Sequence, residues 1–198
     1  MDAPPTLDGT LEALWKTAPA SRFDTDTHGD GGGPATTVQA LWTKDALYMA
    51  WQLEGAGLNV DTTRPTDVER EGLYKEDCVE LFLAPKPDQR GHYYEIELGP
   101  FGHYFDLDVD KDKKTSDIKW SSGVVLATTR DPAAHRVVIE AKIPAAEIAS
   151  ALRAGARLPL GLFRMEGKAP RKYLAWSPAR TDKPNFHLPA AFGTLVLE

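Results

Sequence analysis

Apolar and polar residues alternate with a period of two over much of the 198-residue chain. This alternation is typical of β-strands that bury one face. It is clearest in residues 46–53, 78–83, 92–98, 103–109 and 136–143, and shorter candidate strands cover residues 37–42, 124–128, 159–165, 173–176 and 193–197. Because about ten short strands occur without a strand–helix–strand rhythm, the pattern predicts an all-β fold, an antiparallel two-sheet β-sandwich.

Turn residues separate these strands, and no shift in composition marks a domain boundary. Gly99, Pro100 and Gly102 predict a tight hairpin. One true helix is expected over residues 144–155, because it opens with a proline and stops at a glycine. A short helical turn is expected at residues 11–15. We therefore expect a single β-sandwich domain over residues 1–198, with one short connecting helix.

The alternation also assigns side chains to faces. The inward positions of two long strands are Leu47, Met49, Trp51, Leu53, Val137, Ile139, Ala141 and Ile143. In residues 92–98, the pattern places Tyr94, Ile96 and Leu98 inward and Tyr93, Glu95 and Glu97 outward. In residues 103–109, it sets the apolar Phe105, Leu107 and Val109 against Tyr104, Asp106 and Asp108.

The stretch LYKEDCVELFLAP, residues 73–85, does not fit an ordinary half-buried strand. Its core places Val79, Leu81 and Leu83 on one face, as a half-buried strand requires. The opposite face combines the carboxylate of Glu80 with the aromatic ring of Phe82, and Tyr74 precedes the strand. Such a face is either ordinary surface or one wall of a binding site.

Composition and charge narrow the classes of partner. The net charge is −6, and the longest basic block is Lys113–Lys114, which disfavours nucleic acid as a partner. No apolar run reaches about 18 residues, so no membrane insertion is expected. The start, Met1 to Pro5, lacks a basic and apolar leader. We expect an extracellular or periplasmic location with the leader absent from this sequence, and a cytoplasmic location stays open.

Motifs that indicate catalysis are mostly missing. The single cysteine, Cys78, lies in an alternating strand, where a cysteine is usually a small packed residue. Glu80, Glu95 and Glu97 lie on strands expected to be neighbours, and paired carboxylates are the equipment of a glycoside hydrolase. Carboxylates that are solvated or that bind ligand hydroxyls are the favoured interpretation, because nothing local indicates a raised pKa.

Two acidic stretches are candidate calcium sites. DTDTHGD offers Asp24, Asp26 and Asp30, and DLDVDKD offers Asp106, Asp108, Asp110 and Asp112. Calcium prefers several oxygen ligands from a turning chain, and neither stretch carries the full calcium-binding loop pattern. Alternating acids on a solvated face are the favoured interpretation of the second stretch.

The C-terminal loop combines prolines with an aromatic residue. Phe186 and His187 lie among Pro178, Pro184 and Pro189, where strand periodicity does not place an aromatic ring. Phe186 either anchors the loop to the core or is presented to a ligand. A planar ring beside polar groups suits a sugar, which stacks on the ring while its hydroxyls form hydrogen bonds.

Five segments, in order, resemble the family 9 carbohydrate-binding modules and their wider set of family-9-like domains. They are TLDGTLEALWKTAP, VQALWTKDALYMAWQLEG, YKEDCVELFL, YYEIELGPFGHYFD and LAWSPARTDKPNFHLPAAFGTLVL. The resemblance spans nearly the whole chain and implies a jelly-roll-like sandwich that holds a sugar between two aromatic planes. The matching positions here are Tyr74 and Phe186. Glu80 matches a family carboxylate that contacts sugar hydroxyls.

The resemblance also implies further contacts and partners. Glu95, Arg164 and Lys183 are expected hydroxyl contacts, and structural calcium is a frequent feature of the family. Two smaller aromatics replace the two tryptophans of well-studied members, so affinity or sugar choice is expected to differ. The expected partner is a mono- or oligosaccharide, with a catalytic domain or larger polysaccharide-processing system as a further one.

We therefore expect a non-catalytic carbohydrate-binding module that needs no cofactor. Two alternatives stay open at this point. One is a glycan-active hydrolase that uses Glu80 with Glu95 or Glu97. The other is a structural sandwich domain without a small ligand.

Overall fold

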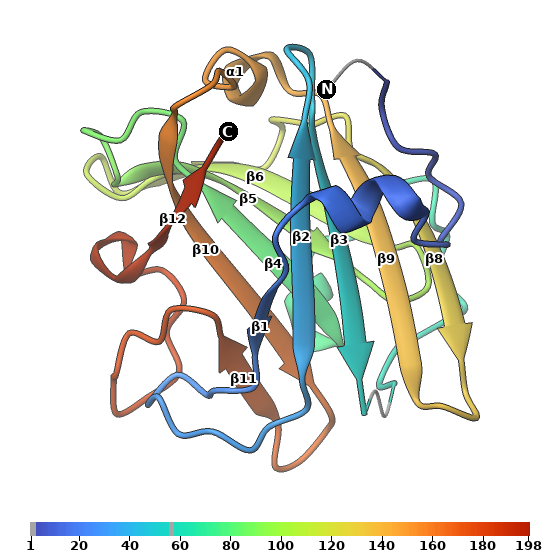
Figure 1. Cartoon of the computed structure of the whole chain (residues 1–198). Helices are drawn as coiled ribbons and strands as arrows, with labels where there is room; N and C mark the ends of the chain where they lie inside the picture. Colours follow the sequence, from blue (N-terminus) through green and yellow to red (C-terminus); the bar gives the residue numbers. More distant parts are fainter. Residues whose placement is uncertain (1–2, 56–57) are drawn as a thin grey trace.

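The computed structural model describes residues 3–55 and 58–198, and two antiparallel β-sheets pack against each other in it (Figure 1). One sheet has the order β1 (Ser21–Phe23), β2 (Thr36–Trp42), β3 (Leu47–Glu54), β9 (Arg136–Ile143), β8 (Val125–Asp131). The other has the order β11 (Lys172–Ala175), β10 (Arg157–Glu166), β4 (Cys78–Leu83), β5 (His92–Leu98), β6 (Tyr104–Asp110), β7 (Thr115–Asp117), and β12 (Gly193–Val196) also pairs with β10. The predicted all-β sandwich is confirmed.

The expected strands are present within a few residues of their predicted bounds. Two further short strands were not predicted. β1 and β7 have three residues each, too few for an alternation to be visible. The hairpin between β5 and β6 is confirmed. Its turn is closed by hydrogen bonds from the Gly99 amide to the His103 carbonyl (2.8 Å) and from the Gly102 amide to the Gly99 carbonyl (3.1 Å).

The predicted helix over residues 144–155 is much shorter than expected. Only α1 (Ala146–Ala149) is α-helical. Beyond it the hydrogen bonds tighten to three-residue spacing, from the Ala151 amide to Ile148 and from the Leu152 amide to Ala149. The spacing of Ile148 and Leu152 reflects burial against the core rather than helix length. The remaining helical turns are 3₁₀: η1 (Ala13–Thr17), η2 (Leu73–Lys75) and η3 (Pro189–Ala191).

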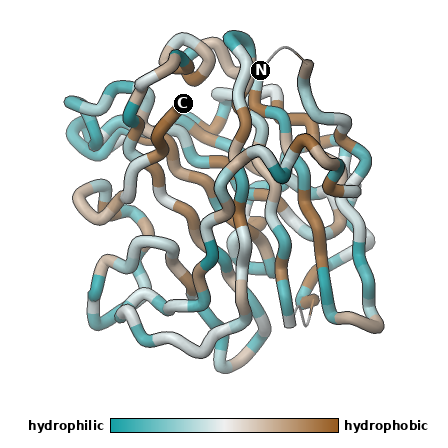
Figure 2. The backbone as a smooth tube through the Cα atoms, in the orientation of Figure 1, coloured by the Kyte–Doolittle hydropathy of each residue, from teal (hydrophilic) through white to brown (hydrophobic). Residues whose placement is uncertain are grey.

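The main hydrophobic core fills the space between the two sheets. The inward positions predicted for β3, β9, β4 and β5 all lie in this core, as expected. Hydrophobic segments follow the strands of both sheets, whereas the loops are mostly hydrophilic (Figure 2). Burial of these apolar side chains supplies the main free energy that holds the sheets together.

A second apolar cluster lies on the other face of the seven-stranded sheet. It contains Phe82, Tyr93, Phe105, Val109, Phe163, Phe186 and Phe192, among others. One expectation changes here. Tyr93, Glu95 and Glu97 do face away from the main core, but they are buried, because residues of the loop after β11 pack over them. Phe105 and Val109 face this second cluster, while Tyr104 packs against the main core.

A buried carboxylate attaches the N-terminal segment to the five-stranded sheet. Glu140 of β9 accepts hydrogen bonds from the indole Nε1 of Trp15 (2.7 Å) and from the amides of Gly9 (2.7 Å) and Asp8 (3.2 Å). A buried carboxylate needs such donors, because a charge without partners is costly in the interior. The Asp-Gly and Trp of the opening segment therefore have a structural role.

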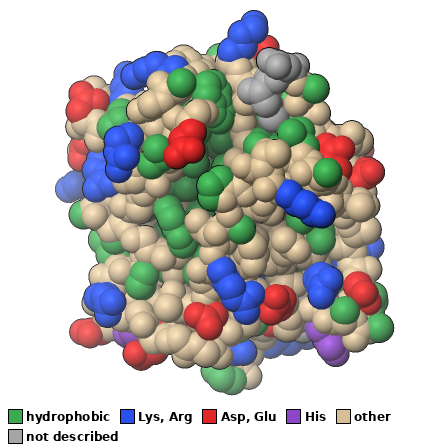
Figure 3. Space-filling view, viewed as in Figure 1, with side chains coloured by type: hydrophobic (Ala, Val, Ile, Leu, Met, Phe, Trp, Pro, Cys, Tyr) green, Lys and Arg blue, Asp and Glu red, His purple; other side chains and the backbone are tan. Residues whose placement is uncertain are grey.

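The face shown in Figure 3 carries interspersed acidic and basic side chains and a hollow. A groove of about 420 Å³ runs between β2 and β12, lined by Val38, Ala40, Trp42, Leu195 and other residues. Within the described residues, no helix is long and apolar enough to span a membrane.

Candidate functional site

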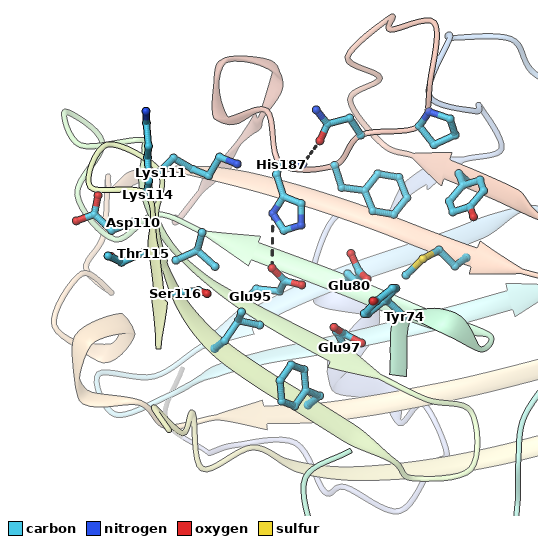
Figure 4. A pocket seen from close by; sticks show the side chains of 18 residues that line it. Tyr74, Glu80, Glu95, Glu97, Asp110, Lys111, Lys114, Thr115, Ser116 and His187 are labelled. Carbon is cyan, nitrogen blue, oxygen red and sulfur yellow. Dashed lines mark hydrogen bonds and ion pairs between the residues drawn. The ribbon is translucent and has the colours of Figure 1, made fainter. Parts of the chain in front are cut away.

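The candidate site is a cavity of about 650 Å³ on the outer face of the seven-stranded sheet. Its lining comes from strands β4, β5, β6, β7, β10 and β11, from η2, and from the loop after β11 (Figure 4). The lining residues are Tyr74, Glu80, Glu95, Glu97, Phe105, Leu107, Val109, Asp110, Lys111, Lys114, Thr115, Ser116, Met165, Tyr173, Pro184, Asn185, Phe186 and His187. A volume of this size suits a small molecule.

Three glutamates from two paired strands line the cavity from the sheet side. Glu80 of β4 and Glu97 of β5 are directly opposite each other in the strand register, and Glu95 lies two residues before Glu97 on the same face. Opposite residues in an antiparallel pair have Cβ atoms about 4.5–5.5 Å apart, so their side chains meet. The strand pairing therefore concentrates three carboxyl groups in one place (Figure 4).

These carboxyl groups are buried and only partly satisfied. The exposed fractions of Glu80, Glu95 and Glu97 are 3%, 5% and 1%. Glu97 accepts a hydrogen bond from the backbone N–H of Tyr74. Glu95 and Glu97 also share a hydrogen bond between their carboxyl groups. Within residues 3–55 and 58–198, however, neither Oε2 of Glu95 nor Oε2 of Glu97 accepts a hydrogen bond from an N–H or hydroxyl group of the protein. Buried oxygens that line a cavity without a partner are available to donors on a ligand.

Burial changes the acidity of all three groups. Desolvation, together with the charge of Glu95, raises the pKa of Glu97 to about 9. Desolvation also raises the pKa of Glu95 to about 7 and raises the pKa of Glu80 well above its ordinary value, with the charges of Glu97 and Glu95 adding to the effect at Glu80. No local sequence pattern indicates these raised pKa values, because the burial arises from the covering loop.

His187 covers the glutamates from the loop side. Its Nδ1 lies 2.7 Å from the hydroxyl of Tyr93 and 3.7 Å from Oε2 of Glu95. Its ring lies 5.1 Å from the ring of Phe82, centroid to centroid. Burial lowers the pKa of His187, which favours the neutral ring. A neutral His187 does not supply a positive charge to the three glutamates.

The two predicted aromatic positions both line the cavity. Tyr74, on η2, is 49% exposed, whereas Phe186, in the loop after β11, is only 8% exposed. The Phe186 ring stacks on Phe163 at a centroid distance of 4.2 Å and an interplanar angle of 12°. Phe186 therefore anchors its loop to the sheet and also forms part of the cavity wall, so both interpretations of this residue apply.

Two predicted contacts lie away from the cavity. Arg164 points into the space between the sheets, where its guanidinium donates hydrogen bonds to the carbonyls of Ala35 (3.0 Å) and Glu54 (3.0 Å) and pairs with Glu166. Arg164 shares the inward parity of Leu160 and Leu162 on β10, so it does not line the candidate cavity. Lys183 is exposed in the loop and does not line the cavity.

The sequence-based set of site residues omitted Glu97, His187 and Tyr173, all of which line the cavity. Glu97 could have been predicted as a site residue, because it lies on the same face of β5 as Glu95. Tyr173 lies at the second position of the edge strand β11, and His187 follows Phe186 in the loop. Only the folded position of that loop brings His187 over the glutamates.

Several carboxylates of the two acidic stretches form hydrogen bonds with other protein groups. Asp26 accepts three backbone hydrogen bonds from residues 28–30, Asp108 bonds His92, and Asp110 bonds Lys113. In the described part of the chain, the one group of three convergent ligand atoms is Cys78, Glu80 and Glu97, within 4.8 Å of one another. Calcium binding by the acidic stretches stays a prediction, which thermal melts with calcium and with chelator would test.

Comparisons with known proteins agree with this architecture. The family described as "Carbohydrate family 9 binding domain-like" matches residues 7–198. No curated protein matches the chain.

Two solved structures share the fold, both of a family 9 carbohydrate-binding module from Caldicellulosiruptor kristjanssonii. The structure in complex with glucose has a TM-score of 0.71 and 16% identity over 99% of this chain and 92% of that chain. The structure in complex with cellotriose has a TM-score of 0.70 and 15% identity over 99% of this chain and 90% of that chain. At this identity the likeness describes the fold. The family match over nearly the whole sequence carries the assignment: the chain belongs to the carbohydrate family 9 binding domain-like family.

Proposed function

We propose that this chain is a non-catalytic module that binds a mono- or oligosaccharide in the cavity above β4 and β5. The observation that carries the proposal is the combination of an exposed aromatic ring, Tyr74, with three buried carboxyl groups in one cavity. A pyranose presents both an apolar face and hydroxyl groups, so it can use a ring and hydrogen-bond acceptors together.

In the proposed complex, Tyr74 and Phe186 supply apolar planes on two borders of the cavity. Tyr74 belongs to η2, which the Glu97 carboxyl holds through the Tyr74 amide. Phe186 is held by its stacking on Phe163. Rings that are already fixed lose little conformational entropy when a ligand binds, which favours affinity. Glu80 and Glu95 are the proposed acceptors for sugar hydroxyls.

The arrangement of the carboxyl groups favours binding over hydrolysis. In glycoside hydrolases two carboxyl groups flank the scissile bond. Here Glu80, Glu95 and Glu97 project from the same face of the same sheet. A sugar above this face would meet all three from one side.

The test is a titration of the intact chain with glucose, cellobiose and cellotriose by isothermal titration calorimetry. The same mixtures are then analysed by chromatography for new or shortened sugars. Saturable binding with unchanged sugars supports the proposal. Product formation would instead support the hydrolase alternative, and the absence of binding to any sugar would support a structural sandwich.

A further inference from the structure

The charge of the cavity is unusual for a site that takes only neutral ligands. Three glutamates that are each more than nine-tenths buried share it. In the described chain, none of the three forms an ion pair with a lysine or arginine. Buried carboxylates are normally paired with a cation or bound to a metal. We therefore expect the ligand to supply the cation that pairs with these glutamates.

The cationic side chains near the three glutamates form other contacts or are exposed to solvent. The Arg171 guanidinium donates to the backbone carbonyls of Lys75 and Glu76 rather than to a glutamate. Lys111 and Lys114 line the cavity and are exposed to solvent (Figure 4). The charge of Lys111 acts on Glu95, but the two residues do not form an ion pair. His187 is closest, but its buried ring favours the neutral form. None of these groups neutralises the glutamates at close range.

We propose that the cavity selects a sugar that carries a protonated amino group, with the ammonium placed among Glu80, Glu95 and Glu97. The inference rests on the sugar-binding function proposed above and specifies the class of sugar. An ammonium group has three N–H donors, and three carboxyl groups converge here. Two of the acceptors are the buried Oε2 atoms of Glu95 and Glu97, which receive no hydrogen bond from an N–H or hydroxyl group of the described residues.

The surroundings also suit a cation. Tyr74 and Tyr173 line the same cavity, and aromatic faces attract ammonium groups. Hydrogen bonds between charged partners are roughly twice as strong as neutral ones. In a buried site with reduced solvent screening, this difference favours an amino group over a hydroxyl at the same ring position.

Binding of an ammonium should displace protons from the cluster. With the pKa values of the three glutamates raised, the ligand-free site holds protons near neutral pH. The other titratable or charged groups that face the cluster are Cys78, whose thiol pKa is raised by burial, Tyr93, His187, Lys111 and Arg171. An ammonium favours the ionised carboxylates, so its binding releases about one proton, whereas a neutral sugar releases none.

The experiment compares three disaccharides that share a β-1,4 linkage: the glucosamine dimer, its N-acetylated counterpart and cellobiose. Calorimetric titrations at about pH 7 in two buffers of different ionisation enthalpy give both affinity and proton release. We expect the glucosamine dimer to bind about tenfold tighter than either neutral dimer, with proton release for it alone. Glu95→Gln should reduce this preference, while the exposed Glu71→Gln should leave it unchanged.

Each remaining outcome has a definite meaning. Equal or tighter binding of cellobiose would overturn the amino-sugar inference and leave the sugar-binding function in place. Failure of all three dimers, glucose and cellotriose to bind would overturn both. If a chelator abolishes binding, or added Mn²⁺ or Zn²⁺ alone binds at Cys78, Glu80 and Glu97, a metal is the missing cation and the inference is wrong.

Discussion

Glu80 on β4 is paired directly with Glu97 on β5, and both carboxyl groups are buried on the outer face of the seven-stranded sheet. Two like charges in such a position repel each other and lack solvent. The pair persists because protons, and on our account a ligand, neutralise it. This relationship links the strand register to the chemistry of the cavity.

Replacing Glu97 should change how stability depends on pH. The folded-state pKa of Glu97 is raised to about 9, so the folded chain holds a proton that the unfolded chain releases above about pH 4.5. Stability is therefore lost as pH rises from about 4.5 toward 9, by up to about 1.4 kcal/mol for each pH unit from this group. Glu97→Gln should flatten this slope and raise the Tm at about pH 8 relative to the unmodified chain.

Thermal melts from about pH 5 to pH 9 measure this effect, with Glu71→Gln as the exposed control that should leave the slope unchanged. An identical pH slope in Glu97→Gln and the unmodified chain would show that Glu97 is ionised in the folded state.

Tyr74→Ala should weaken sugar binding without affecting the fold. The ring is half exposed and lines the cavity, so its loss removes a stacking surface rather than core packing. We expect affinity to fall by about 1–3 kcal/mol, as for a truncated interface hot spot. The free energy of unfolding should change by about 0.5 kcal/mol or less. Calorimetric titration and urea unfolding give the two values, and unchanged affinity would remove Tyr74 from the site.

Phe186→Leu should reduce both affinity and stability. The side chain is buried against Phe163. Replacing it therefore removes packing that stabilises the fold as well as part of the cavity wall. We expect the free energy of unfolding to fall by about 1 kcal/mol, because leucine keeps most of the buried volume. Phe192→Leu is the matched control: it lies in the same cluster but does not line the cavity, so it should lower stability and leave affinity unchanged. Equal loss of affinity in both variants would indicate an indirect effect.

Arg164→Met should lower stability while the folded protein keeps its affinity. Arg164 is buried between the sheets, and its removal deletes its ion pair with the buried Glu166 together with its hydrogen bonds to the carbonyls of Ala35 and Glu54. Breaking such a pair costs about 3–5 kcal/mol. Urea unfolding measures this loss, and sugar titration of the remaining folded protein should give the original affinity. A stable variant with lost affinity would restore Arg164 to the binding site.

Much of the fold could be predicted from the sequence because alternation directly reports which strand face is buried. The inward faces of β3, β4, β5 and β9 follow from it, as does the placement of Glu80 and Glu95 on the opposite face. The same alternation places Arg164 on the inward face of β10, because it lies two residues after Leu162. The resemblance to the family, rather than the alternation, led to its prediction as a contact.

The depth of the site could not be predicted from local pattern. Glu95 and Glu97 are buried because Phe186, His187 and neighbouring residues, about ninety positions later, pack over them. Their raised pKa values follow from this long-range cover, since an isolated strand would leave them in water.

Chemical-shift mapping of backbone amides shows directly whether a sugar binds in the cavity above β4 and β5. During titration with cellobiose or the glucosamine dimer, we expect the largest shifts at Tyr74, Glu80, Glu95 and His187, which line this cavity. Shifts concentrated in the groove between β2 and β12, or no saturable shifts with either sugar, would contradict the account.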